Sequence, residues 1–401
     1  MSRRGSAAPS FLSRTARRII LAAASRVRVG LLLVTLPDGS QRTFGEPGSA
    51  TVAEVSVHDE RAFWAMLTGG EVGAGEAYME GWWSSPDLAA ALRLAALNRG
   101  DLALTSGWVR TPLVIWNTVA HRLRRNTREG SRRNIAAHYD LGNEFYQLFL
   151  DETMTYSSAV FESADDTLAE AQRTKYRRIA DGAGLTKGMH VLEIGSGWGG
   201  FAMYAAGEIG CRVTSITVSR EQRDLAVARV REAGLEHLVE VELRDYRDVG
   251  GTYDAIVSIE MLEAVGAEYF STFFETCDRV LAPGGRLSLQ VITVPDGGYE
   301  RQRRGANWIQ KYIFPGGLLP SLAVIERAAA RTRLIITGVD DIAGHYVRTL
   351  ALWRERFLDR EDAVRAVGFD SRFIRMWEYY LALSEAGFAT GITQDLQVVI
   401  E

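Results

Sequence analysis

The sequence of 401 residues contains 46 lysines and arginines against 50 aspartates and glutamates, and its net charge of −4 offers no overall attraction for nucleic acid. Its hydrophobic content of 47% and charged content of 24% are typical of a folded globular protein, and its length suffices for two or three domains. The two cysteines, Cys211 and Cys277, stand in apolar segments, which favours a reducing compartment and argues against a metal site. No apolar run approaches the roughly 20 residues of a membrane-spanning helix, and no convincing signal-peptide cleavage site follows residues 19–25. We therefore expect a cytoplasmic protein without a bound metal.

The first hundred residues read as a small α+β domain with a basic start. Every charged residue before Asp38 is an arginine, and residues 11–29 combine arginines with apolar side chains in a helical pattern. Such a helix can lie on an anionic membrane surface, although docking on its own domain explains the pattern equally well. We expect the rest of this domain to contain strands at 31–36, 41–44 and 52–57, helices at 60–67 and 87–98, and a glycine-rich segment at 69–83.

Residues 101–133 form a connector in which tryptophans alternate with arginines. Trp108 and Trp116 could lie at the depth of lipid headgroups while the neighbouring arginines contact phosphates. A helix between domains, with a solvated basic face, is the alternative. On the first interpretation the protein is peripherally associated with the inner face of the membrane.

From residue 134 onward, apolar strands alternate with helical patterns. This alternation predicts a doubly wound α/β sheet, in which ligands bind at the carboxyl ends of the strands. The segment 299–333 interrupts the alternation, and we expect it to fold over the site as an inserted helical cap. The expected strands are 190–194, 212–218, 239–243, 253–259 and 286–291, and the expected helices are 166–183, 201–209, 221–233 and 269–280.

A glycine-rich loop follows the first of these strands. Gly195, Gly197 and Gly199 have the spacing G-x-G-x-G, and a helical pattern starts at Phe201. Glycine allows positive φ and close approach of a ligand to the backbone, and the amides at the helix start can meet an electronegative group. A structural turn would explain a lone loop of this kind. Glu193 and a spacing unlike the dinucleotide fingerprint favour a nucleoside-type cofactor such as S-adenosylmethionine.

Several ordered motifs accompany the loop, and together they make the sequence resemble the cyclopropane fatty-acyl-phospholipid synthases. These enzymes are S-adenosylmethionine-dependent methyltransferases that include the mycolic acid cyclopropane synthases. The resemblance covers residues 134–401, and residues 30–90 match more loosely the N-terminal domain of the longer synthases. The motifs are HYDLGNEFY at 138–146, MTYSSAVF at 154–161, ITVSREQ at 216–222, IEMLEAVG at 259–266, WIQKYIFPGG at 308–317, HYVRTL at 345–350 and FIRMW at 373–377.

The resemblance implies transfer of a one-carbon unit to the cis double bond of an unsaturated phospholipid acyl chain. A weakly nucleophilic alkene must be positioned against the sulfonium methyl, and the resulting cation requires aromatic faces or anions and exclusion of water. Ordinary packing would explain each aromatic residue equally well. The candidates for the lining are Tyr246, Tyr312, Phe314, Tyr346 and Trp377.

In the family a bound bicarbonate removes the final proton, held by a cysteine, a glutamate, a histidine, a tyrosine and a backbone group beside an isoleucine. Glu263, Tyr346 and Ile292 match this set. Ser158 stands in the cysteine position and Gln290 in the histidine position, and both can donate hydrogen bonds to an anion. Glu260, where relatives often carry glycine, receives no role, and His138 is interpreted as structural or substrate-contacting.

Cofactor contacts are likewise implied by the resemblance. We expect Tyr156 and Ser157 near the methionine part, the loop residues at the cofactor's centre, and further residues around the ribose and adenine. The alternative for Thr217 and Gln222 is a helix start capped by Ser219. The full set is Tyr156, Ser157, Glu193, Gly195, Gly197, Thr217, Gln222, Asp245 and Tyr246.

Three functions remain open. The first is cyclopropanation of a phospholipid in an anionic membrane. The second is a transfer that ends in a methylene branch because a displaced base removes a different proton; a separate reductase would then produce a 10-methyl chain. The third is a catalytically inactive protein that binds S-adenosylmethionine and membranes. Glu263, Tyr346 and the intact loop argue against the third function, and the resemblance also implies a homodimer.

Overall fold

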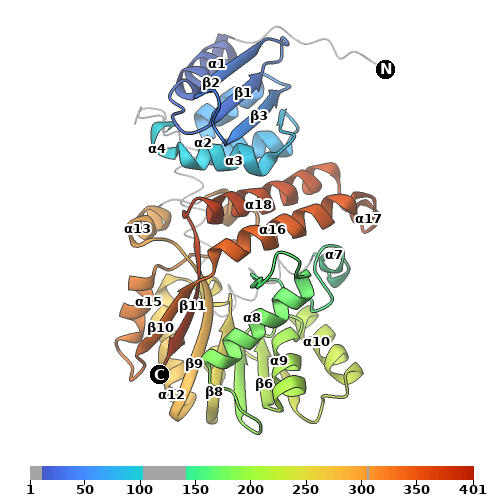
Figure 1. Ribbon diagram of the computed structural model, residues 1–401, viewed down its shortest axis with the longest axis vertical. Coiled ribbons are helices and arrows are strands. Elements are labelled where there is room, and N and C mark those ends of the chain that lie inside the picture. Colours follow the sequence, from blue (N-terminus) through green and yellow to red (C-terminus); the bar gives the residue numbers. More distant parts are fainter. Residues whose placement is uncertain (1–10, 103–140, 305–306) are drawn as a thin grey trace. The chain divides into compact units, whose positions relative to one another are not determined.

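The computed structural model describes residues 11–102, 141–304 and 307–401 (Figure 1). Most of the connector 101–133, together with His138, lies outside these ranges. The chain divides into two compact units: the first contains residues 11–102 and Phe369–Thr390, and the second contains residues 141–368 and Gly391–Glu401.

The first unit contains a four-stranded sheet in the order β2-β1-β3-β4. β1 (Leu31–Thr35) pairs antiparallel with β2 (Gln41–Gly45) and parallel with β3 (Val52–Val57), and β3 pairs antiparallel with the short β4 (Trp83–Ser84). Leu94 packs with Val27 and Ala53 in the buried core of this unit. The helices are α1 (Phe11–Ala24), α2 (Arg61–Met79), α3 (Leu88–Leu97) and α4 (Arg99–Leu102).

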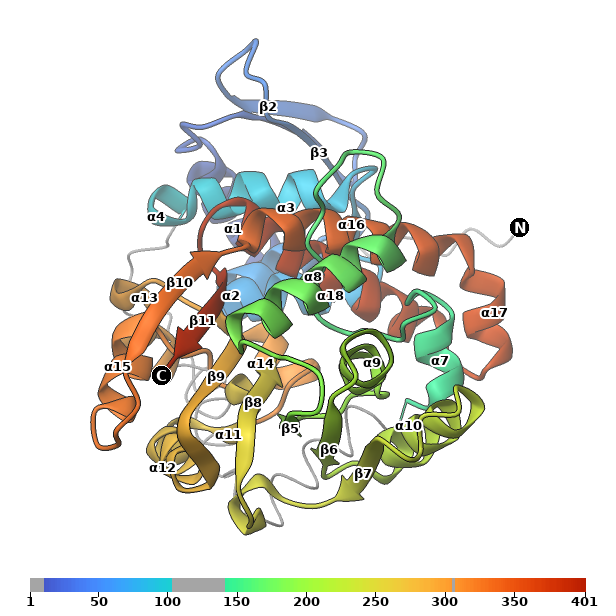
Figure 2. The same cartoon turned by 60° about the horizontal axis from the view of Figure 1, so that its bottom comes forward.

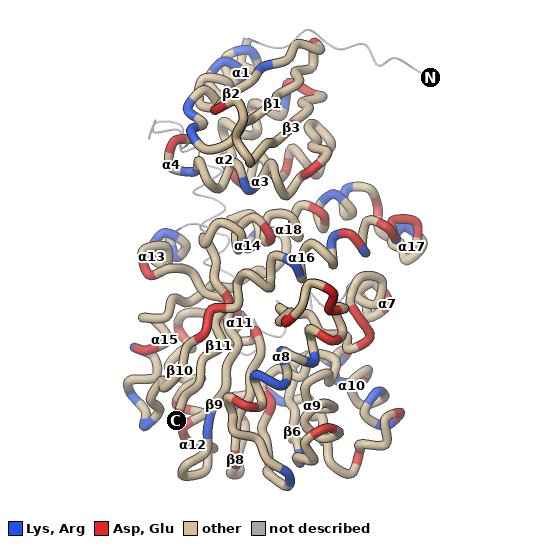
Figure 3. Tube along the Cα trace, in the orientation of Figure 1, with Lys and Arg blue, Asp and Glu red and all other residues tan. Residues whose placement is uncertain are grey.

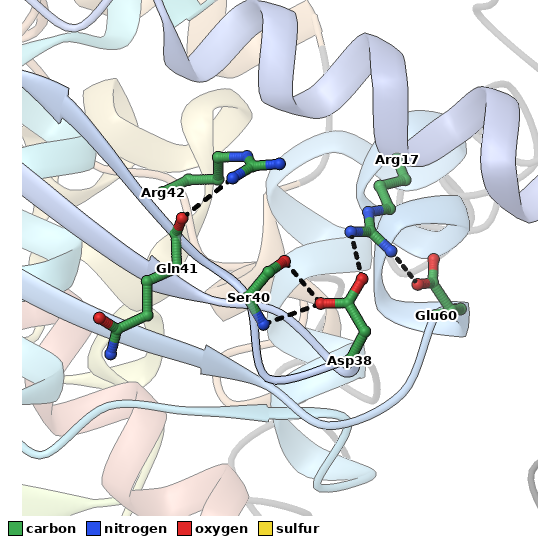
Figure 4. A network of polar contacts seen from close by, with 6 residues as sticks. All are labelled: Arg17, Asp38, Ser40, Gln41, Arg42 and Glu60. Carbon is green, nitrogen blue, oxygen red and sulfur yellow. Dashed lines mark hydrogen bonds and ion pairs between the residues drawn. The ribbon is translucent and has the colours of Figure 1, made fainter.

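The basic helix α1 is docked on this unit, as one of the two sequence interpretations expected. Ala16 is fully buried, and the guanidinium of Arg17 contacts Asp38 at 2.8 Å and Glu60 at 2.9 Å (Figure 4). Other arginines of α1 remain exposed, and lysine or arginine positions recur along the helix (Figure 3). The exposed side of α1 also carries Leu12, so docking leaves a mixed basic and apolar surface.

The glycine-rich segment at 69–83 is largely helical. Helix α2 continues to Met79 through a kink at Gly70, where φ is +56°. A Cβ at Gly73 would lie 1.9 Å from the carbonyl oxygen of Ala65, so glycine is required where the two halves of the helix approach each other. The glycines therefore shape a kinked helix rather than a loop.

Helix α18 (Ser371–Ala389) belongs to the first unit, whereas the sequence prediction placed all of 134–401 in one domain. Tyr78 donates a hydrogen bond to Glu378 at 2.6 Å, and Arg372 pairs with Glu80 at 2.8 Å. These contacts join segments about three hundred residues apart. Local sequence patterns cannot predict contacts over such a separation.

The second unit contains a seven-stranded sheet in the order β10-β11-β9-β8-β5-β6-β7 (Figure 2). The strands from β9 to β7 are mutually parallel, and β11 pairs antiparallel with β9 and β10. The doubly wound α/β fold is confirmed, with two C-terminal strands that the sequence pattern did not predict. The strands are β5 (His190–Ile194), β6 (Arg212–Thr217), β7 (Val239–Leu243), β8 (Tyr253–Ile259), β9 (Leu281–Thr293), β10 (Ile336–Asp341) and β11 (Gln394–Ile400).

Helices cover both faces of this sheet, and successive residues of a strand pack against opposite helical layers. Val191 packs with α8 (Leu168–Gly182), α9 (Gly200–Tyr204) and α10 (Arg220–Glu232). Its neighbour Leu192 lies in a second cluster with α12 (Phe270–Val280) and α15 (Leu322–Ala329). This alternation gives each face its own core.

The segment between β9 and β10 is helical, with α13 (Asp296–Arg304) and α14 (Trp308–Tyr312) preceding α15. The amide of Leu318 donates to the carbonyl of Glu263 at 3.0 Å, which ties this insertion to α11, the helix that follows β8. The remaining helices of the unit are α7 (Asn143–Gln147), α11 (Leu262–Val265), α16 (Ala343–Asp359) and α17 (Glu361–Ala366). Among the described residues, no helix is both long and apolar enough to cross a membrane.

Candidate active site

The site lies where the strand order reverses. β5 pairs with β6 on one side and β8 on the other, so the loops after β5 and β8 flank the same crevice at the carboxyl edge. The two loops are in contact, because a Cβ built on Gly195 would lie 3.2 Å from the Cβ of Met261. Glycine at 195 thus lets the two strand ends meet.

The glycine loop has the backbone that the sequence predicted. Gly195 has φ +101°, Gly197 has φ +48° and Gly199 has φ +85°, a region that side chains rarely adopt. A Cβ on Gly197 would meet no atom within 4 Å, so the loop faces open space there. The hydroxyl of Ser196 is buried without a hydrogen-bond partner among the described residues. The loop therefore presents an unsatisfied hydroxyl to a ligand, whereas the amides of Gly195 and Ser196 donate to the carbonyl of Ile216.

Glu193 lies at the end of β5, below this loop. It is almost fully buried and accepts a hydrogen bond from the hydroxyl of Ser215 on the adjacent strand. Burial raises the pKa of Glu193 to about 8, while Ser215 and Lys175 oppose the shift. A carboxyl tuned in this way can accept or donate a hydrogen bond to a cofactor hydroxyl.

The predicted ribose and adenine residues follow β6 and β7. The hydroxyl of Thr217 donates to the side-chain oxygen of Gln222 at 2.9 Å, and Ser219 caps α10 through the amide of Gln222. The helix cap weighed in the sequence analysis is thus present, and Thr217 and Gln222 bind each other. Asp245 forms a two-point contact with Arg247 at 2.8 and 2.6 Å.

Tyr246 completes the predicted adenine side. Its ring is buried against Phe273, and burial raises the pKa of its phenol. Its hydroxyl has no hydrogen-bond partner among the described residues. An unpaired buried hydroxyl is costly, so a bound polar group would find a donor there.

Tyr156 and Ser157 lie in the segment that precedes α8. The ring of Tyr156 packs against Trp353 with centroids 5.3 Å apart. The hydroxyl of Ser157 accepts a hydrogen bond from Lys175 at 2.7 Å. Lys175 is fully buried, which lowers its pKa to about 8 although Glu260 and other carboxylates favour its charged form.

A partly buried carboxylate, Glu260, lies at the centre of the predicted catalytic residues. Its Oε1 accepts hydrogen bonds from the amide of Ser158 and from Gln290 Nε2, each at 2.8 Å. Its Oε2 accepts the hydroxyl hydrogen of Tyr346 at 2.7 Å. The hydroxyl of Ser158 instead donates to the carbonyl of Ala159 at 3.0 Å, so the backbone of this residue makes the contact.

The backbone of Glu260 is unusual, because its φ is +48°. Non-glycine residues in this region cost of order 1–3 kcal/mol and are concentrated at functional sites. A glycine would adopt this conformation without cost. The three hydrogen bonds to the carboxylate offset the strain of keeping a glutamate here.

Gln290 connects Glu260 to a second buried carboxyl. Its Nε2 also donates to Asp395 Oδ2 at 3.1 Å, and its Oε1 accepts from Gln397 at 3.2 Å. Asp395 is fully buried on β11, and its pKa is raised well above the usual value, first by burial and then by Glu260 and Glu263. Burial therefore favours the protonated form of Asp395.

Glu263 uses the backbone group predicted for the bicarbonate site. Its Oε1 accepts a short hydrogen bond from the amide of Ile292, and its buried Oε2 has no hydrogen-bond partner among the described residues. Burial, followed by the charge of Glu260, raises the pKa of Glu263 to about 8. One carboxyl oxygen of Glu263 is thus left to bind a reactant.

The aromatic candidates separate by unit. Tyr346 is buried in the second unit, where its ring packs edge-on against Trp353 at 6.1 Å. Tyr312 and Phe314 lie in the insertion and are partly exposed. Trp377 lies on α18 of the first unit, so its predicted place in the lining stays a prediction.

Sequence reasoning missed three charged residues of this site: Glu260, Lys175 and Asp395. Glu260 had a readable signal, since a carboxylate ends the apolar strand 253–259 at the ligand-binding edge. Lys175 resembles any basic residue in an amphipathic helix, and Asp395 lies on the unpredicted β11.

The resemblance implied two bound molecules, S-adenosylmethionine and bicarbonate, and the residues of the site suit only the first. The open glycine loop, Ser196 and Tyr246 present unsatisfied groups that suit the polar cofactor S-adenosylmethionine. A bicarbonate does not fit, because Ser158, Gln290 and Tyr346 already donate to the carboxylate of Glu260. Across the described ranges, no three His, Cys, Asp or Glu side chains are grouped as a metal site.

Comparison with known proteins identifies relatives over most of the chain. Residues 126–398 match the family model described as mycolic acid cyclopropane synthetase. A tuberculostearic acid methyltransferase of Mycobacterium tuberculosis is 46% identical over 331 residues, covering 80% of this chain and 77% of the relative. The cyclopropane-fatty-acyl-phospholipid synthase of Escherichia coli is 34% identical over 364 residues, covering 88% of each chain. The structure of mycolic acid cyclopropane synthase CmaA1 with SAH and CTAB aligns with a TM-score of 0.63 and 31% identity, covering 67% of this chain and 97% of CmaA1.

Proposed function

Because the chain belongs to the mycolic acid cyclopropane synthetase family of S-adenosylmethionine-dependent methyltransferases, we propose that it methylates the double bond of an unsaturated phospholipid acyl chain and leaves a methylene branch. The observation that carries this proposal is the contact between the glycine loop and the segment that bears Glu260 and Glu263. Cofactor and carboxylates then face one crevice.

S-adenosylmethionine supplies the methyl carbon, and S-adenosylhomocysteine remains after its carbon–sulfur bond breaks. Gly195, Gly197 and Glu193 would hold it at the end of β5, with Tyr246 and Asp245 beyond. The alkene forms the new carbon–carbon bond and leaves a cation on the neighbouring carbon of the chain. Buried rings and carboxylates stabilise this cation, and burial excludes the water that would trap it.

From the sequence we attributed the methylene branch to loss of a different proton, but both products lose a proton from the new methyl group, because the methylene carbon is the transferred carbon after one of its C–H bonds breaks. If the electrons of that C–H bond attack the cation directly, a cyclopropane ring closes. If a hydride first moves from the methylated carbon to the cationic neighbour, loss of the methyl proton gives a methylene branch on the open chain. Similarity to a protein named tuberculostearic acid methyltransferase supports the second course, because tuberculostearic acid is a methyl-branched fatty acid. A separate reductase would then saturate the branch.

The enzyme must reach a membrane surface to bind its lipid substrate, and the exposed side of α1 is suited to contact such a surface. Arg14 and Arg18 are exposed on this helix, which also exposes Leu12 to 56% and Ile19 to 38%. Arginines attract anionic headgroups, and the apolar side chains can enter the interface. We propose that this side of α1 contacts the anionic leaflet.

Incubation of the purified protein with S-adenosylmethionine and anionic vesicles that contain a mono-unsaturated phospholipid tests this function. We expect the acyl chain to gain one CH₂ by mass spectrometry and to show the proton resonances of a terminal methylene. Cyclopropane resonances would contradict the branched product but retain the one-carbon transfer. An unchanged lipid would contradict the transfer itself.

A further inference from the structure

The carboxylate of Glu260 occupies the hydrogen-bond donors that the family pattern assigns to a bound anion. Those assignments included the positions of Ser158, Gln290 and Tyr346. In this chain the backbone amide of Ser158, the side-chain amide of Gln290 and the hydroxyl of Tyr346 donate to Glu260, at 2.8, 2.8 and 2.7 Å, while the hydroxyl of Ser158 donates to Ala159. One covalently attached carboxylate therefore receives the interactions that would otherwise hold a free one.

A second anion at the same place would be strongly disfavoured. It would have to displace Glu260 from its donors while remaining near the carboxyl groups of Glu263 and Asp395. Like charges in a buried site disfavour each other, and Lys175 is the cation that offsets these groups. The arrangement thus accommodates one negative charge at the centre, and Glu260 supplies it.

We propose that Glu260 is the catalytic base of this chain and replaces an exogenous bicarbonate in removing the proton from the transferred methyl group. This inference rests on the proposed one-carbon transfer, but it holds for either product because ring and methylene formation lose the same proton. It adds a residue to the reaction to which the sequence pattern gave no role.

The protonation pattern around Glu260 is suited to a base. Glu260 accepts three hydrogen bonds, whereas the side chain of Asp395 accepts one from Gln290, so the anionic form is better stabilised on Glu260. The carboxyl groups of Asp395 on β11 and Glu263 on α11 disfavour the ionised form of Glu260. Lys175 on α8 and Tyr346 on α16 favour it. Glu260 is also partly accessible, as a group that must contact substrate requires.

The reaction balances with no further reactant. Carboxylate Oε of Glu260 forms an O–H bond as the methyl C–H bond breaks, and those C–H electrons become the new carbon–carbon bond or the second bond of the methylene. The cation is neutralised, and Glu260 becomes a neutral carboxylic acid. Release of this proton to solvent restores the base for the next turnover.

Two variants of one residue separate a base from a structural carboxylate. Glu260→Gly removes the carboxylate, relieves a backbone with φ +48°, and opens space beside three donors. Glu260→Gln removes the charge but fills the same space. We expect both variants to lose at least about a hundredfold in kcat, the usual scale for general-base catalysis, while the affinity for S-adenosylmethionine by calorimetry stays unchanged.

Bicarbonate is the probe. In bicarbonate-depleted buffer we expect the wild-type protein to be fully active and insensitive to added bicarbonate. Added bicarbonate should restore a large part of the activity of Glu260→Gly and none of that of Glu260→Gln. Full activity of Glu260→Gln, or a requirement of the wild-type protein for bicarbonate, would overturn the proposal.

A binding measurement separates this proposal from the proposed function. With ¹³C-bicarbonate and NMR, Glu260→Gly should show a bound population that the wild-type protein and Glu260→Gln lack. Equal binding to all three proteins would overturn the replacement of bicarbonate by Glu260. Failure of the wild-type protein to modify any lipid, with binding confined to Glu260→Gly, would contradict the proposed function while retaining the anion-replacing role of Glu260.

Discussion

The hydroxyl of Tyr346 donates to Glu260 across 2.7 Å, joining helix α16 to the end of strand β8. The two residues are 86 positions apart, and both lie in the second unit. This hydrogen bond stabilises the ionised form of Glu260 and so lowers its pKa. Burial raises the pKa by more than the hydrogen bond lowers it, so the pKa of Glu260 lies above its usual value of 4.5. The pair therefore sets the pH at which the proposed base becomes available.

Tyr346→Phe should remove that stabilisation without changing the shape of the ring. A hydrogen bond to a charged group contributes about 1.5–3 kcal/mol, so we expect kcat to fall roughly ten- to a hundredfold. The pKa of Glu260 should rise, because an interaction that lowers it is lost, and the acid limb of the pH–rate profile should move to higher pH. A variant with reduced kcat and an unmoved acid limb would contradict this coupling.

Glu263→Gln tests the carboxyl that binds the amide of Ile292. We expect turnover to be abolished and the affinity for S-adenosylmethionine to remain nearly intact, because Glu263 lies on α11 after β8 and not in the glycine loop. Single-turnover kinetics and calorimetry measure the two quantities. Loss of cofactor binding would mean that Glu263 had been assigned to the wrong half of the site.

Glu193 makes stability depend on pH. Its pKa is raised from 4.5 to about 8 in the folded chain, so its favourable contribution is complete below about pH 4.5 and is lost as the pH rises through about 8. Lys175, whose pKa falls from 10.5 to about 8, acts in the opposite sense, losing its contribution as the pH falls through about 8. We expect Glu193→Gln to lessen the decrease in unfolding free energy between pH 5 and pH 8, measured by urea unfolding. An unchanged pH dependence would contradict the buried, protonated Glu193.

The exposed arginines of α1 should govern vesicle binding. Each basic residue near an anionic surface contributes about 1 kcal/mol, so replacing Arg14 and Arg18 of α1, together with the exposed Arg26 just after it, with serine should weaken binding roughly a hundredfold. Binding should also weaken as salt screens the charges. The matched control replaces three exposed arginines of the second unit: Arg212, Arg223 and Arg231.

Vesicle sedimentation at two salt concentrations measures both effects. Equal losses in the α1 variant and its control would assign the attraction to net charge and not to α1. Binding that is independent of salt would exclude the electrostatic part of the membrane proposal. Arg17 is left unchanged in both variants, since its contacts with Asp38 and Glu60 hold α1 on its own unit.

The sequence predicted the parts of the fold that depend on local patterns. The apolar run ending at Glu193 and the glycines after it specify strand β5 and its loop, because period and turn chemistry are encoded in neighbouring residues. The partners of α18 were not predictable in this way. Contacts such as that of Tyr78 with Glu378 join segments far apart in the chain.

Part of the candidate site was predicted for the same reason. Glu263 and Tyr346 belong to recognisable motifs, and Gln290 was identified by its position two residues before Ile292. The structure brings these residues to one edge of the sheet. Glu260 was passed over because relatives often carry glycine at its position; the structure shows a positive φ there, which glycine adopts without strain. Asp395 was missed because the strand that carries it pairs antiparallel with β9 from the far end of the sequence.

The central claim, transfer of one carbon from S-adenosylmethionine to a lipid double bond, is tested most directly by isotope. A bacterium that expresses this chain is fed methyl-deuterated methionine, and its membrane lipids are analysed by mass spectrometry and NMR. We predict acyl chains that retain two deuteriums on a terminal methylene. Two deuteriums in a cyclopropane ring would contradict the branched product, and lipids without label would contradict the transfer itself.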